Sequence, residues 1–250
     1  MSTYFGAICD EFSVGVRLHL KLKLPDNRET VLPFFERVRR AFPSMDRLRH
    51  RRSGGLTLEE NPELPSHMWL RLDGTCLRFG DVNPPDMDRP RQLAAVVLEH
   101  APYHLTLSDL DTDRLELVYE FDLDYGGNHD QLVSETLLGD HPFTSLLAGD
   151  HATHVIECQP CVGIALTPDC ELQAYVELRS RSTTYEASKG QYEPRPLTVS
   201  LNVRRYWGTG EGSDLMAAYD DLCEHAGRLA TDHVIPSIVN PLAHAIASRP

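Results

Sequence analysis

The chain has 250 residues, 41% of them hydrophobic, and contains no apolar run near the roughly 18 residues that a membrane span needs. Its formal net charge of −13 produces a negative field that repels phosphate backbones, which disfavours general binding of nucleic acid. Because residues 1–10 lack a basic segment followed by an apolar one, we expect no signal peptide, no membrane partner and a cytoplasmic location.

The first predicted element is a long strand. Residues 14–24 alternate between apolar and polar side chains throughout, which is typical of a strand with one face in a core. Residues 115–125 show the same alternation, but the polar positions of this second strand are acidic where those of the first are basic. Opposite charges on neighbouring strands stabilise a sheet by a few tenths of a kcal/mol per pair (~0.2–1), so we expect these strands to be adjacent.

Helices and a hairpin are predicted between these two strands. Helical spacing of apolar residues predicts one helix from Thr30 to Phe42 and another from Asp88 to a stop at Pro102. Between them, Asp73-Gly74 favours a tight hairpin over residues 68–79, in a register that places Trp69 opposite Arg78. After the acidic strand, Asn128 is a capping residue for a further helix.

The remainder of the chain is predicted to be mainly strands. They cover residues 155–166, 172–181 and 197–206, and helical segments after Leu215 close the chain, bent or divided by Pro236 and Pro241. Residues 183–196 show no periodicity and are predicted to be a loop, which at this length is more often functional or mobile than idle. Gly149-Asp150 is the best candidate boundary between two halves.

One cluster has the composition of a metal site. His151, His154, Cys158 and Cys161 supply two imidazoles and two thiols, which are the ligand types of structural zinc. In a regular strand Cys158 and Cys161 would point to opposite faces, although Pro160 could kink the strand and bring them together. Separate packing and surface roles are the alternative.

Two further sets of residues are candidates for function. His129 and Asp130, with His141, could act as an acid–base group, but acidic and capping residues also belong at the start of a helix. Seven aromatic residues could partly line an exposed face of the sheet, which favours a peptide or protein partner, with partial burial as the alternative; they are Trp69, Tyr125, Tyr175, Tyr185, Tyr192, Tyr206 and Trp207. The predicted partner-binding residues are Tyr185, Lys189, Tyr192, Arg179 and Trp207.

These elements predict an α+β protein with a large curved, mainly antiparallel sheet packed on one side by amphipathic helices. It forms a single domain or two related halves, residues 1–149 and 150–250. The order of elements resembles that of a widespread group of uncharacterised bacterial proteins with about 250 residues and a SecB-like α+β fold. That resemblance implies an exposed sheet that binds unfolded or partner chains, and it implies no catalytic residues.

The leading functional hypothesis is therefore a non-enzymatic protein-binding or assembly module, chaperone-like or structural. Its partner would be another protein or a second copy of the chain, and no cofactor is expected. The alternative is a metal-dependent enzyme or a metal-stabilised protein with zinc held by His151, His154, Cys158 and Cys161. A small-molecule sensor has no residue pattern for or against it.

Overall fold

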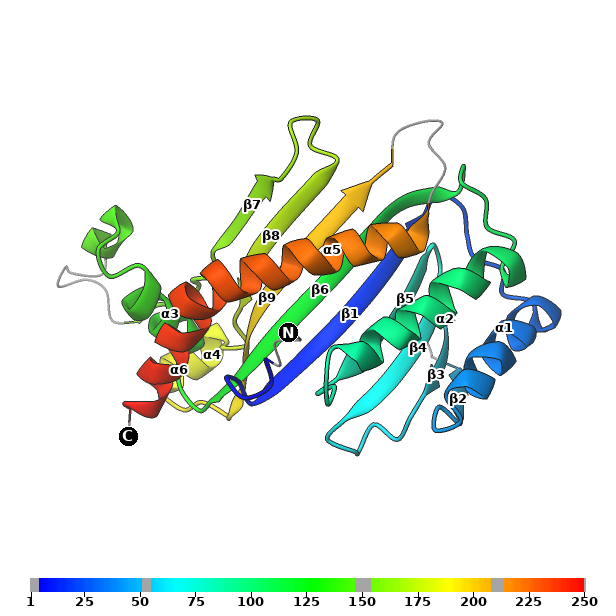
Figure 1. The fold of residues 1–250 in the computed structure, drawn as a ribbon. Helices are drawn as coiled ribbons and strands as arrows, with labels where there is room; N and C mark the ends of the chain where they lie inside the picture. The colour runs from blue at the N-terminus through cyan, green and yellow to red at the C-terminus, as the bar shows by residue number, and fades with distance from the viewer. Residues whose placement is uncertain (1–4, 51–54, 147–153, 208–213, 250) are drawn as a thin grey trace.

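A single antiparallel sheet of nine strands organises the structure, with helices over one of its faces (Figure 1). The computed structural model describes residues 5–50, 55–146, 154–207 and 214–249. The expected α+β class is confirmed. The strands are β1 (Glu11–Leu20), β2 (Arg47–His50), β3 (Leu56–Glu59), β4 (His67–Asp73), β5 (Cys76–Val82), β6 (Thr112–Tyr125), β7 (Cys161–Ala165), β8 (Leu172–Arg179) and β9 (Arg195–Tyr206).

The strand order is β2-β3-β4-β5-β1-β6-β9-β8-β7. The basic strand β1 and the acidic strand β6 lie side by side at the centre, as their charges predict, with Arg17 directly opposite Glu116. The helical elements are α1 (Arg28–Ala41), α2 (Asp88–His104), α3 (His129–Leu137), the 3₁₀ helix η1 (Pro142–Leu146), α4 (Thr184–Lys189), α5 (Leu215–Leu229), the π-helix η2 (Ala230–Val239) and α6 (Asn240–Ala247).

The sheet consists of two sets of elements in the same order. In each set a long strand leads through an asparagine-capped helix into a meander that returns to pair with the long strand, and a long helix follows. Asn27 caps α1 in the first set and Asn128 caps α3 in the second. The sets meet at the β1–β6 pair, so the sheet runs unbroken from one to the other. The predicted boundary at Gly149-Asp150 lies outside the described residues.

The core lies between the sheet and the helices. Alternate residues of β1, including Val14, Val16 and Leu18, are at most 1% exposed and point toward the helices. In Figure 1, α5 runs diagonally over the second half of the sheet, while α1 and α2 cover the first half. The residues between them on β1, Gly15, Arg17 and His19, therefore face the other way.

Several local predictions were wrong for identifiable reasons. The β4–β5 hairpin turns at Gly74-Thr75, which shifts the register by two residues and places Trp69 opposite Gly80 rather than Arg78. The first strand ends at Leu20, since the chain then turns away, and Leu22 is 66% exposed. Helix α2 continues past Pro102 to His104.

The second half also differs from expectation at two places. Residues 154–160 form no strand, and β7 begins only at Cys161. The segment predicted as a loop over residues 183–196 contains the short helix α4. Its start is a capping box, in which Thr183 accepts a hydrogen bond from the Glu186 backbone N–H and the Glu186 carboxylate accepts one from the Thr183 N–H.

Candidate binding face of the sheet

The face of the sheet that points away from α1, α2 and α5 carries a line of arginines. Cross-strand pairing joins one residue from each of six neighbouring strands, from β3 to β9, and β8 extends the line. We call this line the central row; in spatial order it is Thr57, Arg71, Arg78, Arg17, Glu116, Arg204 and Gln173.

Like charges are directly opposed in the first half of the row. Arg71 of β4 faces Arg78 of β5, which in turn faces Arg17 of β1. Directly opposed like charges destabilise a sheet. The Nε atom of Arg78 is buried and has no hydrogen-bond partner within the described part of the chain. This half of the row is therefore a concentration of positive charge in a protein whose net charge is −13.

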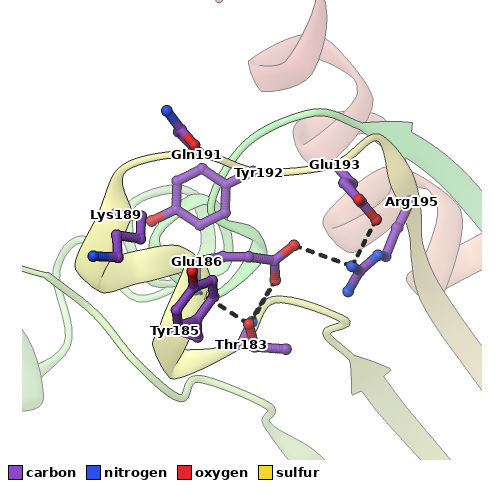
Figure 2. A pocket seen from close by; sticks show the side chains of 8 residues that line it. All are labelled: Thr183, Tyr185, Glu186, Lys189, Gln191, Tyr192, Glu193 and Arg195. Carbon is purple, nitrogen blue, oxygen red and sulfur yellow. Dashed lines mark hydrogen bonds and ion pairs between the residues drawn. The ribbon is translucent and has the colours of Figure 1, made fainter.

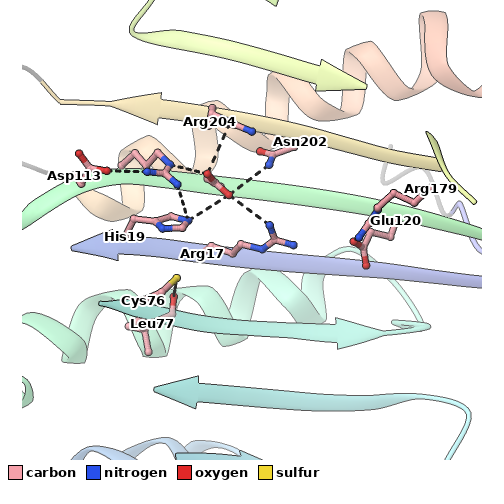
Figure 3. A network of polar contacts seen from close by, with 11 residues as sticks. Arg17, His19, Cys76, Leu77, Asp113, Glu120, Arg179, Asn202 and Arg204 are labelled. Carbon is pink, nitrogen blue, oxygen red and sulfur yellow. Dashed lines mark hydrogen bonds and ion pairs between the residues drawn. The ribbon is translucent and has the colours of Figure 1, made fainter. Parts of the chain in front are cut away.

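The second half of the row is organised around the carboxylate of Glu116. The side chain of Glu116 is 4% exposed, and it accepts hydrogen bonds from Arg114 Nε at 2.7 Å and Asn202 Nδ2 at 3.4 Å. Arg17 and Arg204 lie 3.7 and 3.9 Å away. Figure 3 shows Arg17 of β1 and Asn202 and Arg204 of β9 converging on this point from the two strands that flank β6. One buried carboxylate thus lies between several cations and offsets part of their mutual repulsion.

His19 links Glu116 to Cys76. Its Nε2 atom lies 3.4 Å from Glu116 Oε2, and its direct partner on β5 is Cys76. Hydrogen bonding with the Cys76 thiol, and then with Glu116, raises the pKa of His19 to about 9. Burial opposes ionisation of Glu116, but its hydrogen bonds with His19 and Arg114 outweigh this effect and lower its pKa to about 2.

These shifts predict how stability depends on pH. The stability due to Glu116 is complete above pH 4.5 and is lost as the pH falls toward 2, whereas that due to His19 is complete below pH 6.5 and is lost as the pH rises toward 9. The cluster is therefore most stabilising between these limits. The loss of stability between pH 6.5 and pH 9 is called the alkaline loss here. We expect it to be smaller by about 1–3 kcal/mol in His19→Gln, measured as the free energy of urea unfolding at each pH.

His233→Gln is the control for this measurement, because His233 is exposed on η2 and far from Glu116 in the sequence. That variant should keep the alkaline loss of the unsubstituted protein. An alkaline loss of equal size in His19→Gln would contradict the assignment to His19.

Aromatic rings flank the central row in both halves of the sheet. The guanidinium of Arg71 stacks 4.5 Å from the centre of the Trp69 ring, and that of Arg204 stacks 4.0 Å from the centre of the Tyr175 ring. Arg204 Nε is buried without a hydrogen-bond partner in the residues that the structure describes. Stacking on an aromatic ring fixes the orientation of each guanidinium group and leaves its other side open to an anion.

The structure brings together only part of the predicted partner-binding set. Tyr185, Lys189 and Tyr192 line a hollow of about 350 Å³ beside α4, and Tyr185 is 71% exposed (Figure 2). Arg179 lies instead on β8, where it forms an ion pair with Glu120, and Trp207 follows β9 and is half-buried. The central row was missed, because it depends on the pairing of strands that are distant in sequence.

The residues of the predicted zinc site are only partly described. His154 is exposed, Cys158 is half-buried and Cys161 is exposed at the start of β7, while His151 lies outside the described residues. Among the residues that can be examined, no three histidine, cysteine, aspartate or glutamate side chains are grouped to hold a metal ion. Zinc binding by this set stays a prediction.

His129 and Asp130 have a structural role. Asp130 is 1% exposed and accepts hydrogen bonds from the Cys158 N–H and the Ser180 hydroxyl, each at 2.7 Å. His129 is also buried, and its Nδ1 accepts a hydrogen bond from the Arg181 N–H. Burial lowers the pKa of His129. Asp130 thus fastens Cys158 to α3, which accounts for the position of residues 154–160 outside the sheet, while His129 fastens Arg181.

No protein-family model and no curated protein matches this sequence. None of the helices in the described ranges is long and apolar enough to cross a membrane. The resemblance to SecB-like proteins therefore stays an expectation from the order of elements.

Proposed function

We propose that this protein is a non-enzymatic binding or assembly module that receives an acidic segment of a partner protein on the open face of its sheet. The observation that supports the proposal is the direct opposition of Arg71, Arg78 and Arg17 on three neighbouring strands. This arrangement costs stability in the free protein, and carboxylates placed over it would offset that cost.

The shape of the surface agrees with a chain-like ligand. The residues of the row lie on adjacent strands, so they form a line across the sheet rather than a pocket. Trp69 and Tyr175 supply flat apolar surface beside the arginines at either side of the centre. A segment that alternates acidic and apolar side chains would match both features.

The distribution of charge favours an acidic protein segment over nucleic acid. On the same face, Glu120 and Asp122 follow Glu116 along β6 outside the row, and Glu177 of β8 is exposed. A long phosphate backbone would have to pass these carboxylates and would also meet the overall charge of −13. A short acidic segment can remain over β4, β5 and β1.

A fluorescent peptide of consecutive glutamates tests the proposal, with binding measured by fluorescence anisotropy at low salt. We expect Arg78→Gln to weaken binding about tenfold, because a charge-assisted contact of roughly 1.5–3 kcal/mol is lost. Arg28→Gln is the matched control: it removes the same charge from an exposed residue of α1, on the other side of the sheet.

The proposal requires that the peptide binds and that the two variants differ. No binding by the unsubstituted protein, or equal weakening in Arg28→Gln, would overturn it. Tighter binding of an oligothymidylate of the same charge than of the peptide would instead favour nucleic acid as the partner.

A further inference from the structure

The strand β7 at one end of the sheet is an exposed edge without charge. All five of its residues are exposed, including Val162 at 62% and Ile164 at 48%. Its sequence, Cys-Val-Gly-Ile-Ala, has no charged residue and no proline. Within the described ranges, β8 is its only strand neighbour. An exposed apolar edge of this kind is a template for pairing with another strand.

The opposite edge of the sheet is protected. Strand β2 carries Arg47, Arg49 and His50 along its length of four residues. Charged side chains on an edge prevent it from pairing with a copy of itself, since like charges would be brought together. The edge strand β2 thus carries charges that oppose pairing with another strand, whereas the edge strand β7 carries none.

The backbone of β7 is complementary to itself. Its pairing with β8 is bounded by hydrogen bonds from Leu166 N–H to Leu172 O at 2.8 Å and from Leu178 N–H to Pro160 O at 3.1 Å. In an antiparallel pair such bonds recur at every second residue, so the peptide groups of Cys161, Gly163 and Ala165 point outward. An antiparallel copy centred on Gly163 presents the same groups in register and allows up to about six hydrogen bonds.

The side chains agree with this register. Val162 of one copy would lie opposite Ile164 of the other, on the side of the sheet that carries the helices, and both would be shielded from water. On the other side, Gly163 lies beneath the Tyr175 ring, whose Cε1 is 2.5 Å from where a Cβ would be. The centre of the paired edge therefore carries no side chain that would obstruct it.

We infer that the protein forms a two-fold homodimer in which β7 pairs antiparallel with β7 of a second copy, joining the two sheets into one. A second copy of β7 satisfies three features together. It pairs with the outward peptide groups, it places Val162 against Ile164, and it brings no charge into the edge. Because each chain carries a charge of −13, repulsion between the copies opposes association, and added salt should strengthen the dimer. The inference uses no residue of the central row.

Sedimentation velocity over a range of protein concentrations and at two salt concentrations tests the dimer. We expect Ile164→Lys to weaken association at least about tenfold by placing a charge in the pairing edge. Leu48→Lys is the matched control, because Leu48 is also 48% exposed and lies on the other edge strand. Thermal unfolding of each variant verifies that the chain remains folded.

A disulfide trap tests the register directly. Cys161 of one copy would lie opposite Ala165 of the other, so Ala165→Cys should give a covalent dimer when oxidised glutathione accepts the two electrons of each new bond. The unsubstituted protein should give far less. A monomer at every concentration, equal association in Ile164→Lys, or no increase in covalent dimer with Ala165→Cys would overturn the inference.

Discussion

Replacing Glu116 with alanine is expected to lower the free energy of unfolding by about 2–4 kcal/mol. The carboxylate is buried, and its loss would remove the ion-pair partner of Arg17 and Arg204, while Arg114 would keep its ion pair with Asp113 at 2.8 Å. Removing one partner of a buried ion pair usually costs more than this, but the three guanidinium groups are 22–35% exposed and can be partly hydrated. Urea unfolding at neutral pH measures the difference.

Glu177→Ala is the control, since Glu177 lies on the same face of the sheet but is exposed on β8. We expect that variant to change the free energy of unfolding by less than about 0.5 kcal/mol. The same Glu116→Ala protein should bind the glutamate peptide more tightly, because the central row becomes more positive. Equal stability of the two alanine variants would show that Glu116 does not hold the arginines together.

The second large effect is expected at Gly80, in the middle of β5. A Cβ on this residue would lie 2.5 Å from the backbone oxygen of Val14 and 2.9 Å from Cζ2 of Trp69. The backbone of a central strand cannot move away without disturbing the β1–β5 pair, so we expect Gly80→Ala to cost about 1–3 kcal/mol. Thermal or urea unfolding would measure it.

The residue directly opposite provides the comparison. Gly15 of β1 pairs with Gly80, but a Cβ there would meet its nearest atom, the Cβ of Val118, at 3.9 Å. Gly15→Ala should therefore leave stability unchanged or raise it by a few tenths of a kcal/mol (~0.5), because alanine restricts the unfolded chain. If both variants lose stability equally, strand propensity rather than close packing decides the need for glycine.

The parts of the fold that sequence predicts well are those governed by short-range patterns. Alternation along β1 and β6 identified both strands, and their opposite charges predicted that they are neighbours in the sheet, although not the register that places Arg17 opposite Glu116. Asn128 was recognised as a helix cap from its own neighbourhood. The capping box of Thr183 and Glu186 was also readable from its spacing and was missed.

The candidate site depends on information that no local pattern contains. Arg71, Arg78 and Arg17 become neighbours only through the order of strands in the sheet, and a hairpin register wrong by two residues already separates Arg71 from Arg78. The buried position of Asp130 likewise decides that residues 154–160 stay outside the sheet, because its carboxylate binds the Cys158 N–H. Tertiary contacts overrode the alternation there.

The central position of β1 has a consequence for synthesis of the chain. The two edges of β1 acquire their neighbouring strands at different times, since β5 belongs to the first set of elements and β6 to the second. A chain made from its N-terminus can complete the β1–β5 pair while the other edge of β1, ten residues long, still lacks a neighbour. The free edge of β1 is therefore exposed during the translation of α2 until β6 emerges, and the edge of β6, fourteen residues long, then lacks a neighbour until β9 is made.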